Sequence, residues 1–312
     1  MEYVLLVIGF ALLVKCADIF VDGSSNLAKV LGIPPLIIGL TVVAFGTSAP
    51  EAAVSVTASL SGQNEIAVGN AVGSNICNLL LVLGLSALFN PLKSKREIIV
   101  KDYVFSLLSY LVLLLMVADS FYSGDSISYI TRSEGFVLLC FLGVYVYSLI
   151  LGVASRDKEK QEKKKFEWKD IFYVVIGLVG IIFGGNLVVD SSVEIATNLG
   201  ISSQLVALTI VAVGTSLPEL VTSVIASRKG ETDIAIGNVI GSNIFNIFFI
   251  LGISSALNPL ILNLNSFYDI IIMCFVGIVV YLFAIKNRRI GNKKGIVMLI
   301  LYVIYIFYIA IR

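Results

Sequence analysis

The chain has 312 residues, of which 58% are hydrophobic and 14% charged, with a formal net charge of +1 and a mean hydropathy of +0.97. Soluble domains carry about 25% charged residues, so this composition is typical of a polytopic membrane protein, and the near-zero net charge gives no basis for binding nucleic acid. The chain has no histidine, which excludes histidine-ligated metals, serine–histidine hydrolases and imidazole proton relays.

Ten stretches are apolar and long enough to cross a bilayer as helices, which takes about 20 residues each. In chain order they lie near 3–29, 35–59, 65–89, 102–119, 134–153, 171–197, 203–227, 233–257, 266–285 and 295–311. The first begins almost at the N-terminus without a small-residue cleavage site, so we interpret it as a retained helix. The sequence therefore predicts an all-α polytopic membrane protein with ten transmembrane helices.

The two halves of the chain are copies of each other. Residues 44–51 read Ala-Phe-Gly-Thr-Ser-Ala-Pro-Glu, and residues 212–219 read Ala-Val-Gly-Thr-Ser-Leu-Pro-Glu. A shift of 168 residues aligns 41–92 with 209–260 without a gap, and more than half of the positions are identical. Five spans per copy make the second half enter the membrane from the opposite side, which predicts two inverted repeats related by an axis in the membrane plane. We expect an N-terminal repeat at 1–153, a cytoplasmic linker at 154–170 and a C-terminal repeat at 171–312.

The loop charges predict the orientation. If the N-terminus is outside, the loops after the odd-numbered spans are cytoplasmic, and these loops with their edges hold 19 of the 22 Lys and Arg residues. The positive-inside rule then places both termini outside a cell (plasma) membrane. Lys15 lies within the first span, and we expect it to pair locally with Asp18 or Asp22. Asp22 repeats as Asp190, but both are expected near the membrane edges and neither is assigned to the site.

Each copy places a carboxylate at membrane depth, and such a group indicates a functional site by default. Pro50 and Pro218 remove a backbone donor and clash with the carbonyl four residues earlier, so each helix should break just before Glu51 or Glu219. A break frees carbonyl oxygens beside hydroxyls and a carboxylate. This all-oxygen set is the kind that calcium prefers, with six to eight ligands, and it predicts one shared cation site.

A second repeated block, Gly-Asn-x-x-Gly-Ser-Asn-Ile-x-Asn, begins at Gly69 and again at Gly237. Ser74 and Asn78 are four residues apart and share a helix face, as do Ser242 and Asn246. Small and polar residues can also hold membrane helices together, and this interpretation is preferred for Ser55, Ser59, Thr222 and Ser223. For the Ser and Asn residues of the second block a ligand role is preferred, because the block repeats beside the glutamates.

Two copies of Gly-Thr-Ser-x-Pro-Glu, each followed by this second block, resemble the α-repeats of the sodium/calcium exchanger family of cation/calcium antiporters. The resemblance covers both blocks and the ten-span layout, and it implies spans 2, 3, 7 and 8 as the ion-binding core with spans 1 and 6 as a mobile gate. It implies that Glu51 and Glu219 bridge calcium with help from the carbonyls of Thr47 and Thr215. It implies sodium positions made by Ala44, Ser48 and Ser242 on one side and by Ala212, Ser216 and Ser74 on the other, with Asn78 and Asn246 in the middle.

The resemblance therefore implies an antiporter, not an enzyme, that exchanges sodium for calcium and needs no cofactor. Potassium-dependent relatives have aspartate where this chain has Asn246, so two carboxylates match one calcium ion and a potassium-independent exchanger is expected. A proton-coupled calcium antiporter is the leading alternative, and a cation channel is a more distant one. The sequence identifies no protein partner besides the lipid bilayer and is compatible with a monomer.

Overall fold

The computed structural model describes residues 1–93, 98–122, 127–154, 167–199 and 212–311. The first half contains α1 (Glu2–Leu31), α2 (Pro35–Ile38), η1 (Gly39–Val43), α3 (Ala44–Thr47), α4 (Ala49–Leu60), α5 (Asn64–Cys77), η2 (Asn78–Val82), α6 (Leu83–Phe89), β1 (Leu92–Lys93), η3 (Ile98–Asp102), α7 (Tyr103–Tyr122), β2 (Ile127–Ile130) and α8 (Arg132–Ala154). The second half contains α9 (Trp168–Asn198), α11 (Ala212–Gly214), α12 (Leu217–Arg228), α13 (Thr232–Phe245), η5 (Asn246–Leu251), α14 (Gly252–Leu257), β3 (Leu260–Asn263), α15 (Leu264–Ile285), η6 (Lys286–Arg288), β4 (Arg289–Ile290) and α16 (Asn292–Ile311).

Eight helices in the described part of the chain are long and apolar enough to cross a membrane, and the count is up to nine if the bent pair 35–60 is one span. The remaining expected span, 203–227, the seventh in chain order, begins among residues outside the described ones. The count of ten helices and the inverted repeats therefore remain predictions. The strands form two short antiparallel pairs at helix ends, β1 with β4 and β2 with β3, which the sequence analysis did not predict.

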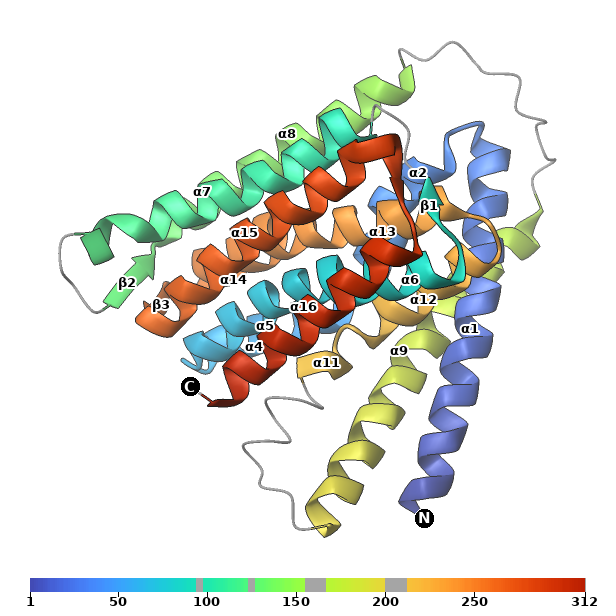
Figure 1. The fold of residues 1–312 in the computed structure, drawn as a ribbon, viewed down its shortest axis with the longest axis horizontal. Helices are drawn as coiled ribbons and strands as arrows, with labels where there is room; N and C mark the ends of the chain where they lie inside the picture. The colour runs from blue at the N-terminus through green and yellow to red at the C-terminus, as the bar shows by residue number, and fades with distance from the viewer. Residues whose placement is uncertain (94–97, 123–126, 155–166, 200–211, 312) are drawn as a thin grey trace.

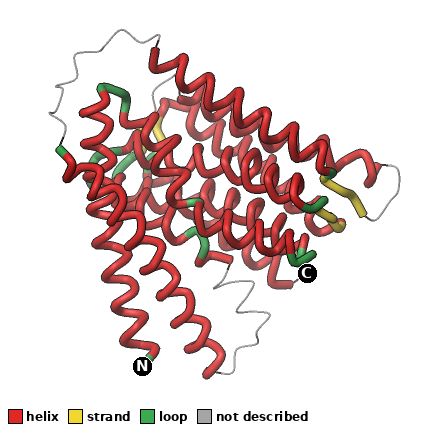
Figure 2. Tube along the Cα trace, turned by 180° about the vertical axis from the view of Figure 1, so that it is seen from behind, coloured by secondary structure: helices red, strands yellow, loops and turns green. Residues whose placement is uncertain are grey.

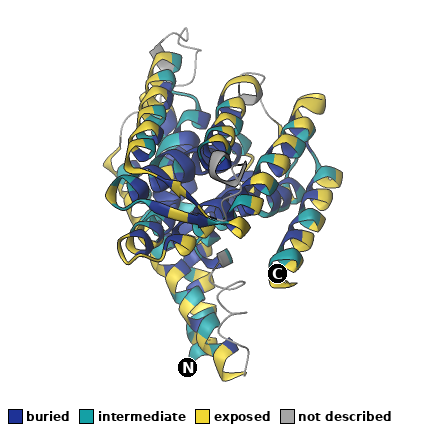
Figure 3. Cartoon of the chain, turned by 90° about the vertical axis from the view of Figure 1, so that its left-hand side faces the viewer, coloured by how far each residue is buried: buried dark blue, intermediate teal, exposed yellow. Residues whose placement is uncertain are grey.

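Two continuous helical segments form the centre of the molecule. In α5–η2–α6, 72% of the most apolar 18-residue window is buried, and in α13–η5–α14 the share is 89%, whereas the other candidate spans lie between 22% and 39%. Figure 3 shows the same contrast, with buried residues inside and exposed ones along the outer helices. The second repeated block of each half lies on these two segments, so polar residues that the sequence repeats are enclosed by protein.

Both glutamate-bearing helices break where the prolines predict. Helix α3 ends at Thr47 and α4 begins at Ala49, with a bend of 47° between the two helical segments. In the second half α11 ends at Gly214 and α12 begins at Leu217. Each proline is the second residue of its new helix, where a missing backbone N–H costs nothing.

Helices α1 and α9 pack against each other and lie beside the core as a pair (Figures 1 and 2). A Cβ at Gly9 would come within 2.9 Å of Val188 Cγ2 and 3.2 Å of the Gly184 carbonyl, so this contact requires glycine. Helix α9 also covers both breaks, because Leu178 lies against Gly46 and Val189 against Gly214.

Candidate ion-binding site

Glu51 and Glu219 are each the third residue of a helix that starts at a break, and both side chains are fully buried. The first turn of a helix carries unsatisfied N–H groups and the positive end of the helix dipole, which stabilises a carboxylate there. A buried ionised carboxylate still costs much free energy without a partner charge or hydrogen bonds. The two glutamates therefore need compensation from their surroundings.

That compensation crosses between the two halves of the chain. Ser48 Oγ, from the first break, donates to Glu219 Oε1 at 2.9 Å. Ser216 Oγ, from the second break, lies 3.2 Å from Glu51 Oε1 and 3.0 Å from Ser74 Oγ. Ser242 Oγ lies 3.4 Å from Glu219 Oε1. The structure thus joins both breaks and both second blocks into one cluster around the two carboxylates.

Twelve buried side-chain atoms have no hydrogen-bond partner among the described residues, and four of them are oxygens of the repeated glutamates and asparagines: Glu51 Oε2, Glu219 Oε2, Asn78 Oδ1 and Asn246 Oδ1. The amide nitrogens of Asn78 and Asn246 donate to Asn243 Oδ1 and Asn75 Oδ1, both at 3.0 Å, which leaves the amide oxygens free to accept. Buried polar atoms without a partner are uncommon, and a bound ion is one physical explanation where several of them belong to repeated motifs. Two carboxylate and two amide oxygens form a donor set that fits a hard cation.

The remaining expected residues lie around this cluster. The Ala44 carbonyl accepts from the Ser48 backbone N–H at 3.0 Å and lies 3.4 Å from Ser242 Oγ. The Thr47 and Thr215 hydroxyls donate to Asn238 and Asn70, at 3.0 and 3.1 Å. Ala212 is the first residue of α11, and its side chain lies outside the described part.

Four asparagines, Asn70, Asn75, Asn238 and Asn243, were not assigned roles by the sequence analysis. Asn75 and Asn243 orient the amides of Asn246 and Asn78, and Asn243 Nδ2 also donates to the Tyr110 hydroxyl at 2.7 Å. The sequence did mark these residues, because Asn70 and Asn75 of the second block repeat as Asn238 and Asn243. The partners that lie in the other half of the chain could not be read from it: Thr215 for Asn70, Thr47 for Asn238, Asn246 for Asn75 and Asn78 for Asn243.

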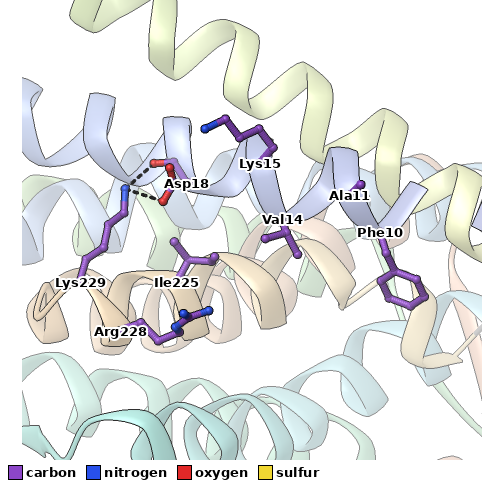
Figure 4. A pocket seen from close by; sticks show the side chains of 8 residues that line it. All are labelled: Phe10, Ala11, Val14, Lys15, Asp18, Ile225, Arg228 and Lys229. Carbon is purple, nitrogen blue, oxygen red and sulfur yellow. Dashed lines mark hydrogen bonds and ion pairs between the residues drawn. The ribbon is translucent and has the colours of Figure 1, made fainter. Parts of the chain in front are cut away.

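The expected pairing of Lys15 is wrong. Lys229, directly after α12, lies 2.8 Å from Asp18 Oδ1 and 2.7 Å from Asp22 Oδ1, and the dashed lines in Figure 4 join Asp18 to Lys229 and not to Lys15. Lys15, Asp18 and Lys229 border an open cavity of about 710 Å³ between α1 and α12. Helix α12 ends beside α1, so Lys229, the residue after its last turn, reaches both aspartates at once. Asp22 belongs to this contact and not to the glutamate cluster.

Comparison with known proteins identifies the family. The family described as sodium/calcium exchanger protein matches residues 1–151 and 169–311. The chain belongs to this family. The sodium/calcium exchanger MaX1 of Methanosarcina acetivorans is 34% identical to this exchanger over an alignment 340 residues long, gaps included, and the alignment covers 98% of this chain and 97% of MaX1. The inner membrane protein YrbG of Escherichia coli is 40% identical over 269 residues, covering 82% and 79%.

Solved structures of the sodium-calcium exchanger NCX_Mj share the fold of this exchanger, with a TM-score of 0.85 and 33% identity over 98% of this chain and 97% of that one. The all-helical, polytopic membrane fold expected from the sequence is confirmed at this level. The exchanger is a membrane transporter and not an enzyme.

Proposed function

We propose that this exchanger moves calcium in one direction and sodium in the other by alternating access, without potassium. The observation that carries the proposal is the pair of fully buried glutamates whose Oε2 atoms, with two asparagine oxygens, have no partner among the described residues. One dehydrated divalent ion between two carboxylates is neutralised by them, so the cluster suits Ca²⁺ in charge as well as in ligand type.

The calcium ion would be held by Glu51 and Glu219 together with the main-chain carbonyls of Thr47 and Thr215. Asn78 and Asn246 would line the middle of the site with their free amide oxygens. Sodium would replace calcium in this region and use the flanking oxygens of Ala44, Ser48 and Ser242 on one side and of Ala212, Ser216 and Ser74 on the other. The hydrogen bonds from Ser48 and Ser216 to the glutamates support this division, because they place a hydroxyl beside each carboxylate.

Sodium as the driving ion is supported by the relatives. MaX1 and NCX_Mj are both named sodium/calcium exchangers, and the NCX_Mj structures concern extracellular ion exchange and occlusion of the binding site. Potassium independence is supported by Asn246. In the part of the chain that the structure describes, no third acidic side chain joins the two glutamates in a group that could hold a metal ion, so no additional carboxylate there demands another cation.

The proposed topology has ten helices in two inverted repeats, 1–153 and 171–312, with a cytoplasmic linker at 154–170 and both termini outside the cell (plasma) membrane. The strand pairs support it. The positive-inside assignment places β1 and β4 on the cytoplasmic side and β2 and β3 on the outer side, and the strands pair within each side. The hydrogen bond between Glu65, in the first turn of α5, and Asn263, the last residue of β3, likewise joins two element ends that the assignment places outside.

The test is calcium-45 uptake into proteoliposomes of the purified protein, with sodium, potassium and proton gradients imposed separately. We expect uptake only with sodium loaded inside, and no change when potassium is removed. Uptake driven by a proton gradient in the absence of sodium would contradict the proposal and establish the proton-coupled alternative. A requirement for potassium would contradict the two-carboxylate argument.

A further inference from the structure

Two asparagines, Asn70 and Asn238, make the same three contacts in the two halves of the molecule. Asn238 Nδ2 donates to Ser223 Oγ at 2.9 Å and to the Glu219 carbonyl at 3.4 Å, while its Oδ1 accepts from Thr47 Oγ1 at 3.0 Å. Asn70 Nδ2 donates to Ser55 Oγ at 2.9 Å and to the Glu51 carbonyl at 3.2 Å. Its Oδ1 accepts from Thr215 Oγ1 at 3.1 Å.

Each amide therefore joins a glutamate helix to the break of the opposite half. Asn70 binds the main chain of Glu51 in α4 on one side and Thr215, between α11 and α12, on the other. Asn238 does the same for Glu219 in α12 and for Thr47, the last residue of α3. Thr47 and Asn238 are fully buried, so their hydrogen bond does not compete with water, whereas Asn70 and Thr215 are half-buried.

A carboxamide is the side chain that can make these contacts. It offers two N–H donors and a carbonyl acceptor within one short planar group, whereas aspartate only accepts and leucine does neither. The contact uses the proton of the threonine hydroxyl and does not involve the threonine main-chain carbonyl.

We propose that Asn70 and Asn238 are positioning residues that hold the two half-sites at a fixed separation, each by binding the threonine of the opposite break. This inference rests on the proposed exchange function and adds residues that contact no ion. A divalent cation needs several oxygens in place at once, so a loosened half-site weakens calcium binding before it slows ion movement.

The sharpest variants change the threonines. Thr47→Val and Thr215→Val remove the hydroxyl while keeping the shape and the main-chain carbonyl, and Thr47→Ser and Thr215→Ser restore the hydroxyl. One lost hydrogen bond with a stranded buried acceptor lowers affinity by about tenfold. We expect each valine variant to raise the KM for calcium by about that factor with kcat nearly unchanged, and each serine variant to recover most of it.

Thr222→Val is the matched control. Thr222 is a buried threonine of α12 whose hydroxyl has no partner in the described part of the chain. Its loss should leave the KM for calcium unchanged, because no hydrogen bond is broken. A KM that rises equally in the control would mean that any valine at these depths disturbs the site, and this would overturn the positioning role.

A double-mutant cycle of Asn70→Ala and Thr215→Val separates positioning from general packing. If the two side chains act through one hydrogen bond, the double variant should bind calcium no more weakly than Asn70→Ala alone. Strictly additive losses would overturn the proposal, as would valine variants with wild-type calcium affinity. If Asn70→Ala does not fold, the valine and serine variants of Thr47 and Thr215 still test the positioning role.

Calcium affinity should be measured by titration calorimetry as well as by transport, because binding does not depend on which ion drives exchange. A wild-type protein that binds calcium but shows no sodium-driven uptake would contradict the proposed function alone. Calorimetry on the same variants would still test the positioning residues.

Discussion

At the scale of single residues, the exchanger places two carboxylates where water cannot reach them and gives each one a single hydroxyl partner atom from the opposite half. Ser48 and Ser216 each satisfy one oxygen of a glutamate, and the second oxygen of each stays free. A protein that needed the glutamates only for packing would satisfy both oxygens. Two carboxylates that each keep one oxygen free are instead suited to an ion that binds and is released reversibly.

Glu51→Gln and Glu219→Gln should each reduce sodium-driven calcium uptake to the background of empty liposomes. Each variant removes half of the charge that compensates a dehydrated divalent ion, while the neutral amide is easier to bury, so folding should survive. Calcium-45 uptake checks the loss of transport, and the size-exclusion elution profile of the purified protein checks that the variant still folds. Glu65→Gln, an exposed carboxylate in the first turn of α5, is the control and should transport normally. Near wild-type uptake by either site variant would refute the shared site.

Asn246→Asp should make transport depend on pH or on a monovalent cation such as potassium. The substitution adds a third negative charge beside two glutamates that already match one calcium ion, so the excess must be balanced by a proton or a second cation. Calcium uptake should be measured with sodium and potassium varied independently at several pH values. Asn292→Asp adds the same charge at the exposed start of α16 and should change nothing. An Asn246→Asp variant that behaves like the wild type would place residue 246 outside the site.

The repeated motifs were enough to select the two glutamates, the four serines and the middle asparagines Asn78 and Asn246, but not the four asparagines Asn70, Asn75, Asn238 and Asn243 that hydrogen-bond around them. They were not enough to select contacts. Thr47 binds Asn238 and Thr215 binds Asn70, so each pairing crosses the halves and separates its partners by 191 or 145 residues. A periodic pattern along one chain carries no information about which repeat supplies the partner.

At the scale of elements, the two helix breaks were predictable because proline lacks a backbone N–H and clashes with the carbonyl four residues earlier, an effect that depends only on neighbouring residues. The π-helical segments were not. η2 begins at Asn78 and η5 at Asn246, so both middle asparagines start a wider turn. Such turns occur often at functional sites, but they arise from one extra residue in a turn, which leaves no distinctive residue type in the sequence.

The contact of Lys229 with Asp18 and Asp22 should hold α1 against α12, together with the 2.6 Å hydrogen bond from Ser25 Oγ to Glu231. Lys229→Met should weaken this attachment by about 1 kcal/mol, in the range of partly exposed ion pairs. Hydrogen exchange of the α1 amides near Asp18 and Asp22 should become faster. Lys15→Met, on the same helix, should leave exchange unchanged. Equal rates in the two variants would show that the ion pairs do not restrain α1.

The attachment should also be insensitive to alkaline pH. Burial lowers the pKa of Lys229, but the hydrogen bonds and charges of Asp18 and Asp22 outweigh it and raise the pKa above the ordinary 10.5. A raised lysine pKa gives stabilisation that is fully present below the unfolded-state pKa and is lost only as pH rises through the folded-state value. After correction for the intrinsic exchange rate, protection of α1 should be constant from about pH 7 to about pH 9. A decline within that interval would contradict the raised pKa.

At the scale of the whole molecule, composition was enough to predict a polytopic helical membrane protein, because hydrophobic length alone determines which segments can cross a bilayer. The orientation is a separate inference from the loop charges. The paired strands were outside the reach of the sequence, since β1 and β4 have only two residues each.

Cysteine labelling tests the orientation. Gln63→Cys should react with an impermeant thiol reagent added outside intact cells, whereas Lys93→Cys and Lys293→Cys should react only after the membrane is opened. All three positions are exposed, and the exposed native Cys140 should be replaced first. The basic loops motivate the expectation. Labelling of Lys293→Cys from outside would contradict the orientation, and labelling of Lys93→Cys and Lys293→Cys from opposite sides would contradict the ten-span topology.

The most direct test of the central claim is anomalous diffraction from crystals soaked with Sr²⁺, a heavy substitute for calcium, at low and then at high sodium concentration. We expect one strong peak within about 2.7 Å of carboxylate oxygens from both Glu51 and Glu219, and its loss as sodium rises. A peak that contacts only one glutamate, or one that sodium does not displace, would contradict a single site shared by the two halves of the exchanger.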